Sequence, residues 1–106
     1  MPKLVFRARA ENDLTKLLVY IAKSSGSPER AINYIRRIRE RCETLLTFPE
    51  SGRRRDDLRP GIMVIGFEKR AVIAYKVLPS GDIEIGRVFY GGRNYEALIG
   101  HRDRMS

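Results

Sequence analysis

The residues of this chain best suited to chemistry are arginines, lysines and tyrosines in its second half. After the arginine triplet at 53–55 they are Arg59, Lys69, Arg70, Tyr75, Arg87, Tyr90, Arg93 and Tyr95. Guanidinium groups bind phosphates and tyrosine rings stack on bases, so such a set can hold RNA. It also suits a metal-free ribonuclease, in which arginine stabilises the pentavalent phosphate and tyrosine serves as acid or base.

For most of these residues the simpler interpretation is an ordinary surface charge. Acidic residues lie close to them in the sequence, among them Asp56, Asp57 and Glu84. Arg87 differs, because its spacing matches Ile83, Ile85 and Phe89 in a mostly apolar strand. An arginine there either pairs with a carboxylate or faces a ligand.

Metal and cofactor chemistry is not indicated. The chain has one cysteine, Cys42, and one histidine, His101, which cannot form a transition-metal site together. Cys42 falls on the apolar face of a predicted helix and is expected in the core. Gly91 and Gly92 follow a strand without the Lys-Ser/Thr of a phosphate loop. We therefore expect no metal and no cofactor.

Composition predicts one folded domain over residues 1–106. The net charge of +8 favours an acidic partner such as nucleic acid or an acidic protein. A single cysteine suits a reducing compartment. We find neither a signal peptide nor a run of transmembrane length, so the expected location is the cytoplasm, away from membranes.

Three strands are predicted between residues 61 and 90, over 61–67, 71–78 and 83–90. Only short turns join them, so they must form an antiparallel meander. In the middle strand one parity carries Ile73 and Tyr75 and the other carries Val72 and Leu78. A strand that is apolar on both sides requires cover on both faces of the sheet.

Two amphipathic helices are predicted before the meander, over residues 8–25 and 27–48. The first has an apolar stripe and ends near Gly26; the second begins with Ser27 as its N-cap and Pro28 in its first turn. This helix hairpin covers one face of the sheet. Only the loop at 50–59 and the tail at 94–106 remain for the other face, so we expect an exposed apolar surface that a partner covers.

The order of these elements resembles the RelE/ParE superfamily of bacterial toxin–antitoxin toxins, and local motifs favour the ParE branch. The motifs are the linker FPESGR at 48–53 with DLRPG at 57–61, AYKV at 74–77, and IEIGRVFYGGRNYEAL at 83–98. The resemblance runs from Leu4 to about Ile99. It implies an α+β fold: an N-terminal strand and an antiparallel helix hairpin packed on a three-stranded antiparallel meander, with a short C-terminal helix.

That resemblance also implies a function. ParE-like toxins inhibit DNA gyrase and growth, stabilise plasmids, and form a hetero-oligomer with a ParD-like antitoxin that neutralises them. Operator DNA is bound only through the antitoxin. No catalytic residue is then expected. The residues we assign to target or partner binding are Arg59, Tyr75, Arg87, Tyr90 and Arg93.

Two alternatives remain open. A RelE-like, ribosome-dependent mRNA endoribonuclease would place Arg59, Arg87 and Tyr90 around the scissile phosphate. The lysine cluster of that branch is not evident in this sequence. The second alternative is a basic binding module that has lost its toxic activity and binds only its antitoxin.

Overall fold

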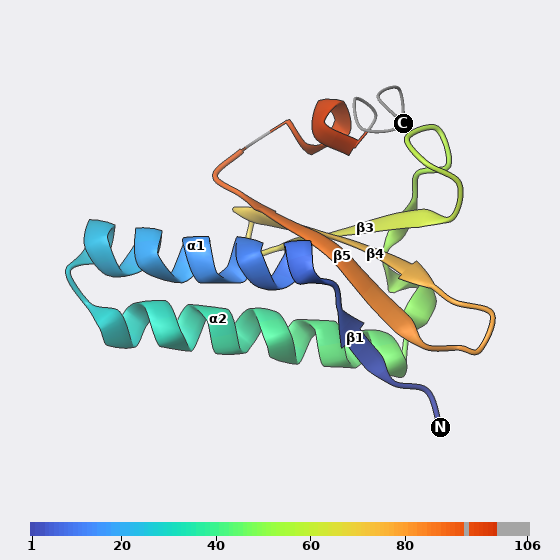
Figure 1. The fold of residues 1–106 in the computed structure, drawn as a ribbon, viewed down its shortest axis with the longest axis horizontal. Coiled ribbons are helices and arrows are strands. Elements are labelled where there is room, and N and C mark those ends of the chain that lie inside the picture. The colour runs from blue at the N-terminus through green and yellow to red at the C-terminus, as the bar shows by residue number, and fades with distance from the viewer. Residues whose placement is uncertain (93, 100–106) are drawn as a thin grey trace.

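The computed structural model describes residues 1–92 and 94–99 and confirms the predicted α+β fold (Figure 1). Short 3-10 turns at Thr44–Leu46 and Pro49–Ser51 follow the second helix, and residues 95–99 are helical. The main elements are β1 Leu4–Phe6, α1 Ala8–Ser25, α2 Pro28–Glu43, β2 Arg53–Arg54, β3 Ile62–Phe67, β4 Ala71–Val77 and β5 Ile83–Tyr90.

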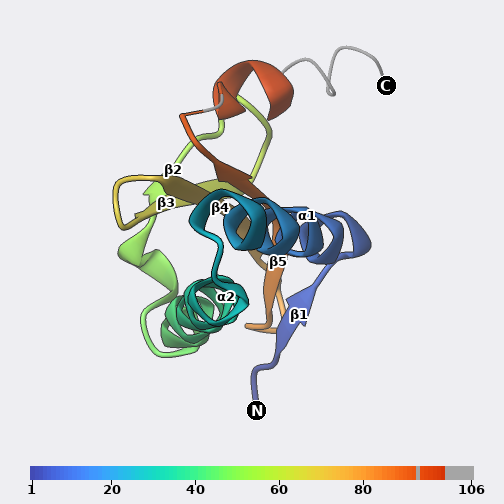
Figure 2. The ribbon, with the colours of Figure 1, turned by 90° about the vertical axis from the view of Figure 1, so that its left-hand side faces the viewer.

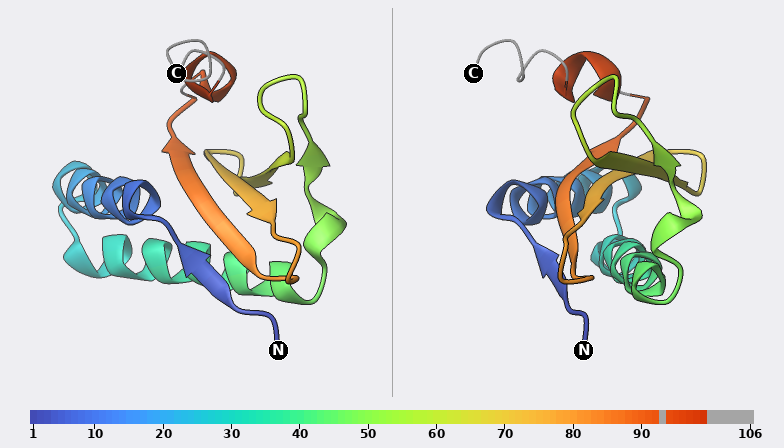
Figure 3. Two further views of the ribbon diagram at one scale, coloured as in Figure 1. Left: turned by 45° about the vertical axis from the view of Figure 1, so that its right-hand side comes forward. Right: turned by 90° about the vertical axis from the view of Figure 1, so that its right-hand side faces the viewer.

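The strands form one twisted sheet of five strands in the order β1-β5-β4-β3-β2, which extends the predicted meander at both edges (Figure 3). The strands β3, β4 and β5 are antiparallel neighbours, as expected from their short turns. At one edge β1 runs parallel to β5, with Leu4 opposite Ile83. This pairing brings the start of α1 beside the last strand.

The two helices lie side by side on one face of the sheet, as the end-on view shows (Figure 2). Gly26 ends α1 with a left-handed φ of 69°, which glycine adopts without steric cost. Ser27 then caps α2 by accepting a hydrogen bond from the Arg30 N–H at 3.2 Å. The helix predicted over 27–48 ends at Glu43 and is followed by a 3-10 turn at Thr44–Leu46. Pro49 then disfavours a helical conformation at Phe48.

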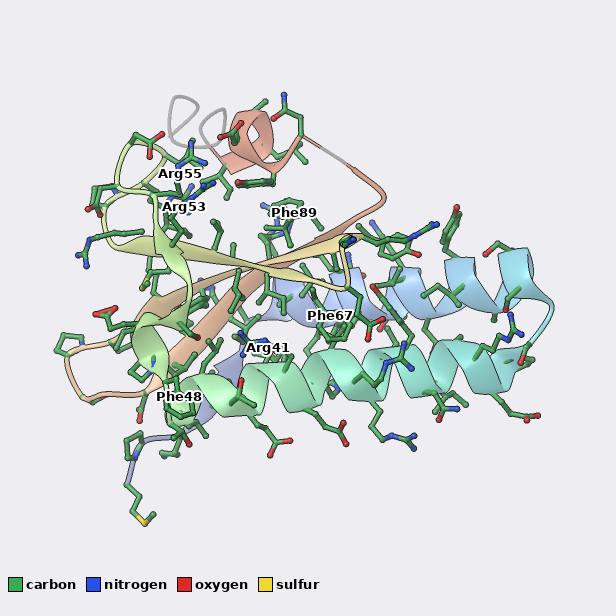
Figure 4. The ribbon with its side chains drawn as sticks, turned by 180° about the vertical axis from the view of Figure 1, so that it is seen from behind. Arg41, Phe48, Arg53, Arg55, Phe67 and Phe89 are labelled. Carbon is green, nitrogen blue, oxygen red and sulfur yellow. The ribbon has the colours of Figure 1, made fainter. Side chains whose placement is uncertain are left out.

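Two hydrophobic clusters lie on opposite faces of the sheet. The first joins α1 and α2 to the sheet and includes fully buried residues such as Leu14, Ile38 and Ile73. The second is smaller and centres on Phe89. Its members and their partly buried neighbours are Ile62, Val64, Ala74, Phe89, Ile99, Leu58, Val72, Tyr95 and Leu98. Figure 4 shows Phe67 on the helix side of the sheet and Phe89 on the other side.

The second cluster corrects the expectation of an uncovered sheet face. Leu58 in the loop and Tyr95, Leu98 and Ile99 near the C-terminus pack against that face, and Ile62 and Val64 beneath them are 6% and 5% exposed. A short loop and a single helical turn suffice because β3 and β4 present small or medium side chains there. Segments of the chain itself thus cover the apolar side chains of β4 on both faces of the sheet.

A β-bulge changes which face each residue of β5 occupies. Tyr75 pairs with Ile85 but Ala74 pairs with Arg87, so Gly86 is the extra residue. Ile85 and Val88 both join the helix-side cluster, whereas Phe89 joins the opposite one. The prediction that Arg87 shares a face with Ile83 and Ile85 is therefore wrong, because the extra residue Gly86 lies between them. The prediction that Arg87 shares a face with Phe89 is correct.

Candidate functional site

A cavity with several cationic side chains in its lining lies where α1 begins, beside β4 and β5. Its volume is about 240 Å³. Among the described residues that line it, five are cationic and only Glu84 is acidic. We call it the cationic cavity. Its lining residues are Arg7, Ala8, Arg9, Arg59, Ile62, Ala74, Tyr75, Lys76, Glu84, Gly86, Arg87 and Ile99.

Arg87 is held in this cavity by Asp13 of α1. Its Nε and Nη2 donate to the two carboxylate oxygens at 2.8 and 3.1 Å, and the same carboxylate accepts the Val88 N–H at 2.9 Å. The side chains of Arg87 and Asp13 are only 15% and 10% exposed. The guanidinium also lies 4.8 Å from the centre of the Phe89 ring. The sequence left two possibilities for Arg87, a carboxylate partner or a ligand, and the structure shows the carboxylate partner.

Tyr75 is a core residue rather than an accessible one. Its side chain is fully buried, its hydroxyl donates to the Pro49 carbonyl at 2.8 Å, and it accepts the Gly52 N–H at 3.0 Å. Burial raises the pKa of this hydroxyl above its usual value. A Cβ on Gly52 would lie 2.5 Å from the hydroxyl oxygen. Tyr75 therefore anchors the linker that follows α2 and presents no surface to a partner.

Tyr90 lines a different hollow, formed with Asp13, Lys16 and Tyr20 beside the open edge of β5. Its ring packs edge-on against Tyr20 at 6.0 Å and against Tyr34 at 5.8 Å between centroids. Arg59 and Arg87 line the cationic cavity instead. The structure brings these two arginines to one cavity and places Tyr90 outside it.

Arg93, the remaining predicted site residue, lies outside the described residues. Three cationic residues that the sequence reasoning did not single out do line the cavity: Arg7, Arg9 and Lys76. Arg7 and Arg9 lie at the other end of the chain from the predicted site residues, and Lys76 has an ordinary charged position in an otherwise apolar strand. The two arginines flanking Ala8 at a helix start were the available signal, and only the β1–β5 pairing shows that they meet β5.

The arginine triplet, in contrast, is largely neutralised by its own neighbours. Arg54 pairs with Asp56 at 2.7 Å, and Arg55 pairs with Asp57 at 2.8 Å and with Glu96 at 2.6 Å. The hydrogen bond from Arg55 lowers the pKa of Asp57. The pKa of Asp56 is lowered first by the Gly61 N–H and then by Arg54. Figure 4 shows Arg53, at the start of β2, and Arg55, just after that strand, near the C-terminal helix.

Within residues 1–92 and 94–99, no three His, Cys, Asp or Glu side chains gather as metal ligands would. None of the helices in that part of the chain has the length and hydropathy needed to cross a bilayer.

Comparison with known proteins gives this arrangement a family. Residues 4–95 match the family model described as the ParE toxin of the type II toxin–antitoxin system, parDE. No curated protein matches the chain. A solved structure described as the chromosomal ParDE TA system from P. aeruginosa has the same fold, with a TM-score of 0.73 at 23% identity over 86% of this chain and 97% of that one. Since the family model spans most of the sequence, the chain belongs to the ParE toxin family of type II toxin–antitoxin systems.

Proposed function

We propose that this protein is the toxin of a ParDE-type pair, that it inhibits DNA gyrase in the cytoplasm, and that tight binding of a ParD-like antitoxin neutralises it. The observation that carries the proposal is the family match over residues 4–95. Inhibition of gyrase and neutralisation by ParD are the properties expected of that family. The function requires protein–protein recognition and no catalytic group.

The antitoxin is the partner that the family relationship favours. The structure with the similar fold is described as a ParDE TA system, in which a toxin and an antitoxin occur together. This chain also leaves large apolar side chains exposed on its helices and between the two 3-10 turns, including Tyr20, Ile32 and Phe48 at 58%, 56% and 65%. They are available to an amphipathic antitoxin segment, which binds through apolar anchors at helical spacing.

The ribonuclease alternative is supported less well. It needs Arg59, Arg87 and Tyr90 within reach of one phosphate, because an acid or base must lie within hydrogen-bond distance of the atom it protonates or deprotonates. Tyr90 lines another hollow and packs between Tyr20 and Tyr34. Arg87 is engaged by Asp13. We therefore keep this alternative only as an outcome of the experiment below.

The experiment is inducible expression of the chain without antitoxin, with a DNA-damage reporter and the integrity of several messages followed in the same culture. A gyrase inhibitor that traps cleaved DNA should switch on the reporter and stop growth while messages stay intact. Early message cleavage without damage signalling would move the protein to the ribonuclease branch. Normal growth with soluble protein would leave a binding module without toxic activity.

Two controls sharpen the result. Co-expression with a cognate ParD-like antitoxin should restore growth, and that antitoxin should co-purify with the toxin. Tyr90→Phe retains the ring contacts with Tyr20 and Tyr34 and removes only the hydroxyl. The gyrase proposal expects this variant to remain toxic, whereas a ribonuclease using Tyr90 as acid or base should lose activity by 10²-fold or more, the order expected for general acid–base catalysis.

A further inference from the structure

We propose that the surface around Tyr20 and Tyr90 binds single-stranded nucleic acid, whose bases stack on the two rings while its phosphates contact cations beside them. This goes beyond the proposed function, because inhibition of gyrase and neutralisation by an antitoxin require only protein contacts. We call this region the tyrosine surface. Its members are Lys16, Tyr20, Arg30, Tyr34, Arg70 and Tyr90.

Two hollows meet at this surface and share Tyr90 in their linings. The first, of about 350 Å³, lies between α1 and the end of β5. The second, of about 370 Å³, lies between the end of α1 and α2. Each falls within the roughly 300–1,000 Å³ of pockets that hold a small ligand. Two adjoining hollows of this size suit successive bases of one strand.

The rings form a stacking platform that the fold holds in place. Tyr20 is 58% exposed and lies edge-on to Tyr90, with 6.0 Å between the ring centres. Tyr34 packs edge-on against Tyr90 at 5.8 Å and against Phe67 at 5.6 Å. Since these rings are already ordered, little side-chain freedom is lost on binding. Bases stack on such rings whatever their sequence, and a single strand presents their faces more freely than a duplex.

The cations of the tyrosine surface have no carboxylate partner in the part of the chain that the structure describes. No Asp or Glu there lies within salt-bridge distance of Lys16, Arg30 or Arg70. Asp13 lines the first hollow, but it is bound by Arg87. These cations are therefore available to phosphates, which lysine and arginine both bind.

Lys16 and Arg30 place positive charge in both hollows. Lys16 lies one helical turn before Tyr20 on α1, and both residues line the first hollow. Arg30 lines the second hollow, and its side chain is exposed. A strand whose bases contact the rings can therefore place a phosphate in each hollow.

Arg70 adds a third cation where the hairpin between β3 and β4 meets the end of β5. Its carbonyl accepts the N–H of Gly91, a residue that lines the first hollow, at 2.9 Å. Its charge also acts on Tyr34: burial raises the pKa of that hydroxyl to about 12, and the positive charge of Arg70 opposes the rise. The Arg70 guanidinium is therefore near the rings as well as the hollow.

Tyr34 supplies a hydrogen-bond donor that the described residues do not use. It is 9% exposed and lines the second hollow, and no described group accepts a hydrogen bond from its hydroxyl. Buried polar groups are nearly always hydrogen-bonded, so this hydroxyl calls for a partner from outside the described chain. A water that accompanies a bound base can be that partner.

The polar groups of the second hollow favour nucleic acid over an acidic peptide. Ser24, Ser25 and Asn33 are exposed there, and their hydroxyls and amide can hydrogen-bond the edge of a base. The aliphatic residues of the first hollow, Leu17 and Val88, are only 6% and 4% exposed. They offer little surface to the apolar anchors of a peptide. The negative faces of the rings also repel a carboxylate.

The test is fluorescence anisotropy with the purified full-length protein across a series of salt concentrations. The labelled probes have equal length and are a single-stranded DNA, a single-stranded RNA and a DNA duplex. Because Tyr20 is also available to an antitoxin segment, the protein is assayed without antitoxin. Tyr20→Ala removes the exposed ring, and Tyr20→Phe retains it as the matched control.

A second pair of variants tests the cations. Lys16→Gln combined with Arg70→Gln removes two charges from the tyrosine surface. Its control, Lys3→Gln combined with Arg36→Gln, removes the same two charges from exposed positions outside the linings of both hollows. All the substituted side chains are exposed, so every variant should melt like the parent.

We expect both single strands to bind more tightly than the duplex. Tyr20→Ala should lose about tenfold in affinity, the effect of one stacking contact, and Tyr20→Phe should stay within about twofold of the parent. The Lys16 and Arg70 variant should lower the slope of log affinity against log salt by about 1.4, since each phosphate contact with a single strand contributes about 0.7. Its control should keep the parent's slope. The single strand that binds more tightly identifies DNA or RNA as the ligand.

Several results would overturn the proposal. One is the absence of binding to either single strand at physiological salt, and another is a duplex that binds as tightly as the single strands. Parental affinity in a folded Tyr20→Ala variant, or an equal change of slope in the two charge variants, would also refute it. Displacement of the probe by polyglutamate as effectively as by unlabelled single strand at equal charge would assign the surface to an acidic protein. None of these results bears on gyrase inhibition, which the growth experiment measures separately.

Discussion

The carboxylate of Asp13 on α1 binds the guanidinium of Arg87 on β5 through two hydrogen bonds of 2.8 and 3.1 Å. Strand β1 pairs with β5 only as far as Ile85, so among residues 1–92 and 94–99 no strand lies along the outer edge of β5 beyond that point. Asp13 also accepts the Val88 N–H there, and one carboxylate thus satisfies both a strand arginine and an open sheet edge. A substitution at Arg87 will consequently report on folding as well as on any contact with a target.

Asp13→Asn is expected to lower the free energy of unfolding by about 2–3 kcal/mol. The amide can still accept the Val88 N–H, but it leaves the positive charge of Arg87, whose side chain is 15% exposed, without a carboxylate. Urea unfolding followed by circular dichroism measures the change.

The matched comparison is Glu11→Gln, two residues earlier on the same helix. Glu11 also forms a two-bond pair, with Arg39, but those side chains are 48% and 41% exposed. Solvent screens such a pair, so the expected loss is below about 1 kcal/mol. Equal losses for the two variants would contradict the view that burial gives the Asp13–Arg87 pair its larger effect.

Tyr75→Phe is expected to destabilise the fold by about 1–2 kcal/mol, because the Pro49 carbonyl and the Gly52 N–H both lose their partner. Gly52→Ala should be at least as damaging, since its methyl group would lie 2.5 Å from the Tyr75 hydroxyl and 2.9 Å from the Val64 carbonyl. Thermal melts of both variants provide the measurement. An unchanged melting temperature for Gly52→Ala would show that the linker can move away without cost.

Local signals in the sequence were enough to predict most of the elements. Gly26, Ser27 and Pro28 define the turn between the helices through their own backbone preferences, and the structure uses them as expected. The meander follows from short apolar runs joined by tight turns. One of these turns has positive φ at Glu68 and Lys69, a conformation that is uncommon for glutamate and lysine and could not be predicted from these residue types.

Contacts between residues far apart in the sequence could not be predicted from these local signals. Periodicity alone assigns Arg87 to the face of Ile85, and only the register of β4 against β5 reveals the extra residue at Gly86 that reverses it. The pairing of β1 with β5 brings Arg7 into the same cavity as Arg87, although most of the chain separates the two residues in the sequence. The cover on the second sheet face likewise depends on tertiary packing of segments too short to show a period.

Ile38→Ala is expected to cost about 2–4 kcal/mol, because Ile38 is fully buried between α2 and the sheet and its truncation leaves a cavity. Ile32→Ala, on the same helix, is the control. Ile32 is 56% exposed, so its truncation should change stability by less than about 0.5 kcal/mol. Chemical denaturation of the two variants compares the same chemical change at a core and a surface position. Similar losses would refute the assigned orientation of α2.

The thiol of Cys42 is expected to be inert in the native protein. Its side chain is fully buried, and burial raises its pKa to about 12. The thiolate is the reactive form, so a disulfide reagent at pH 8 should label the native chain very slowly and label it fully in denaturant. Cys42 is the single cysteine of the sequence, which makes the signal unambiguous. Rapid native labelling would mean that α2 opens locally or is packed differently.

Stability is expected to decline as pH rises from about 9 to about 12. Burial is the main cause that raises the pKa of Cys42 from 9.0 to about 12 and that of Tyr34 from 10.0 to about 12. In this window the unfolded chain releases protons that the folded chain retains, so the free energy of unfolding falls as pH rises. Below about pH 9 both groups are protonated in both states and do not change the free energy of unfolding.

Tyr34→Phe tests this dependence directly. Tyr34 is 9% exposed, and among the described residues its hydroxyl has no hydrogen-bond partner, so the substitution removes a titrating group without breaking a contact. The slope of unfolding free energy against pH should become shallower between pH 10 and about 12. An unchanged slope for Tyr34→Phe would mean that burial of Tyr34 is not the cause of the pH dependence.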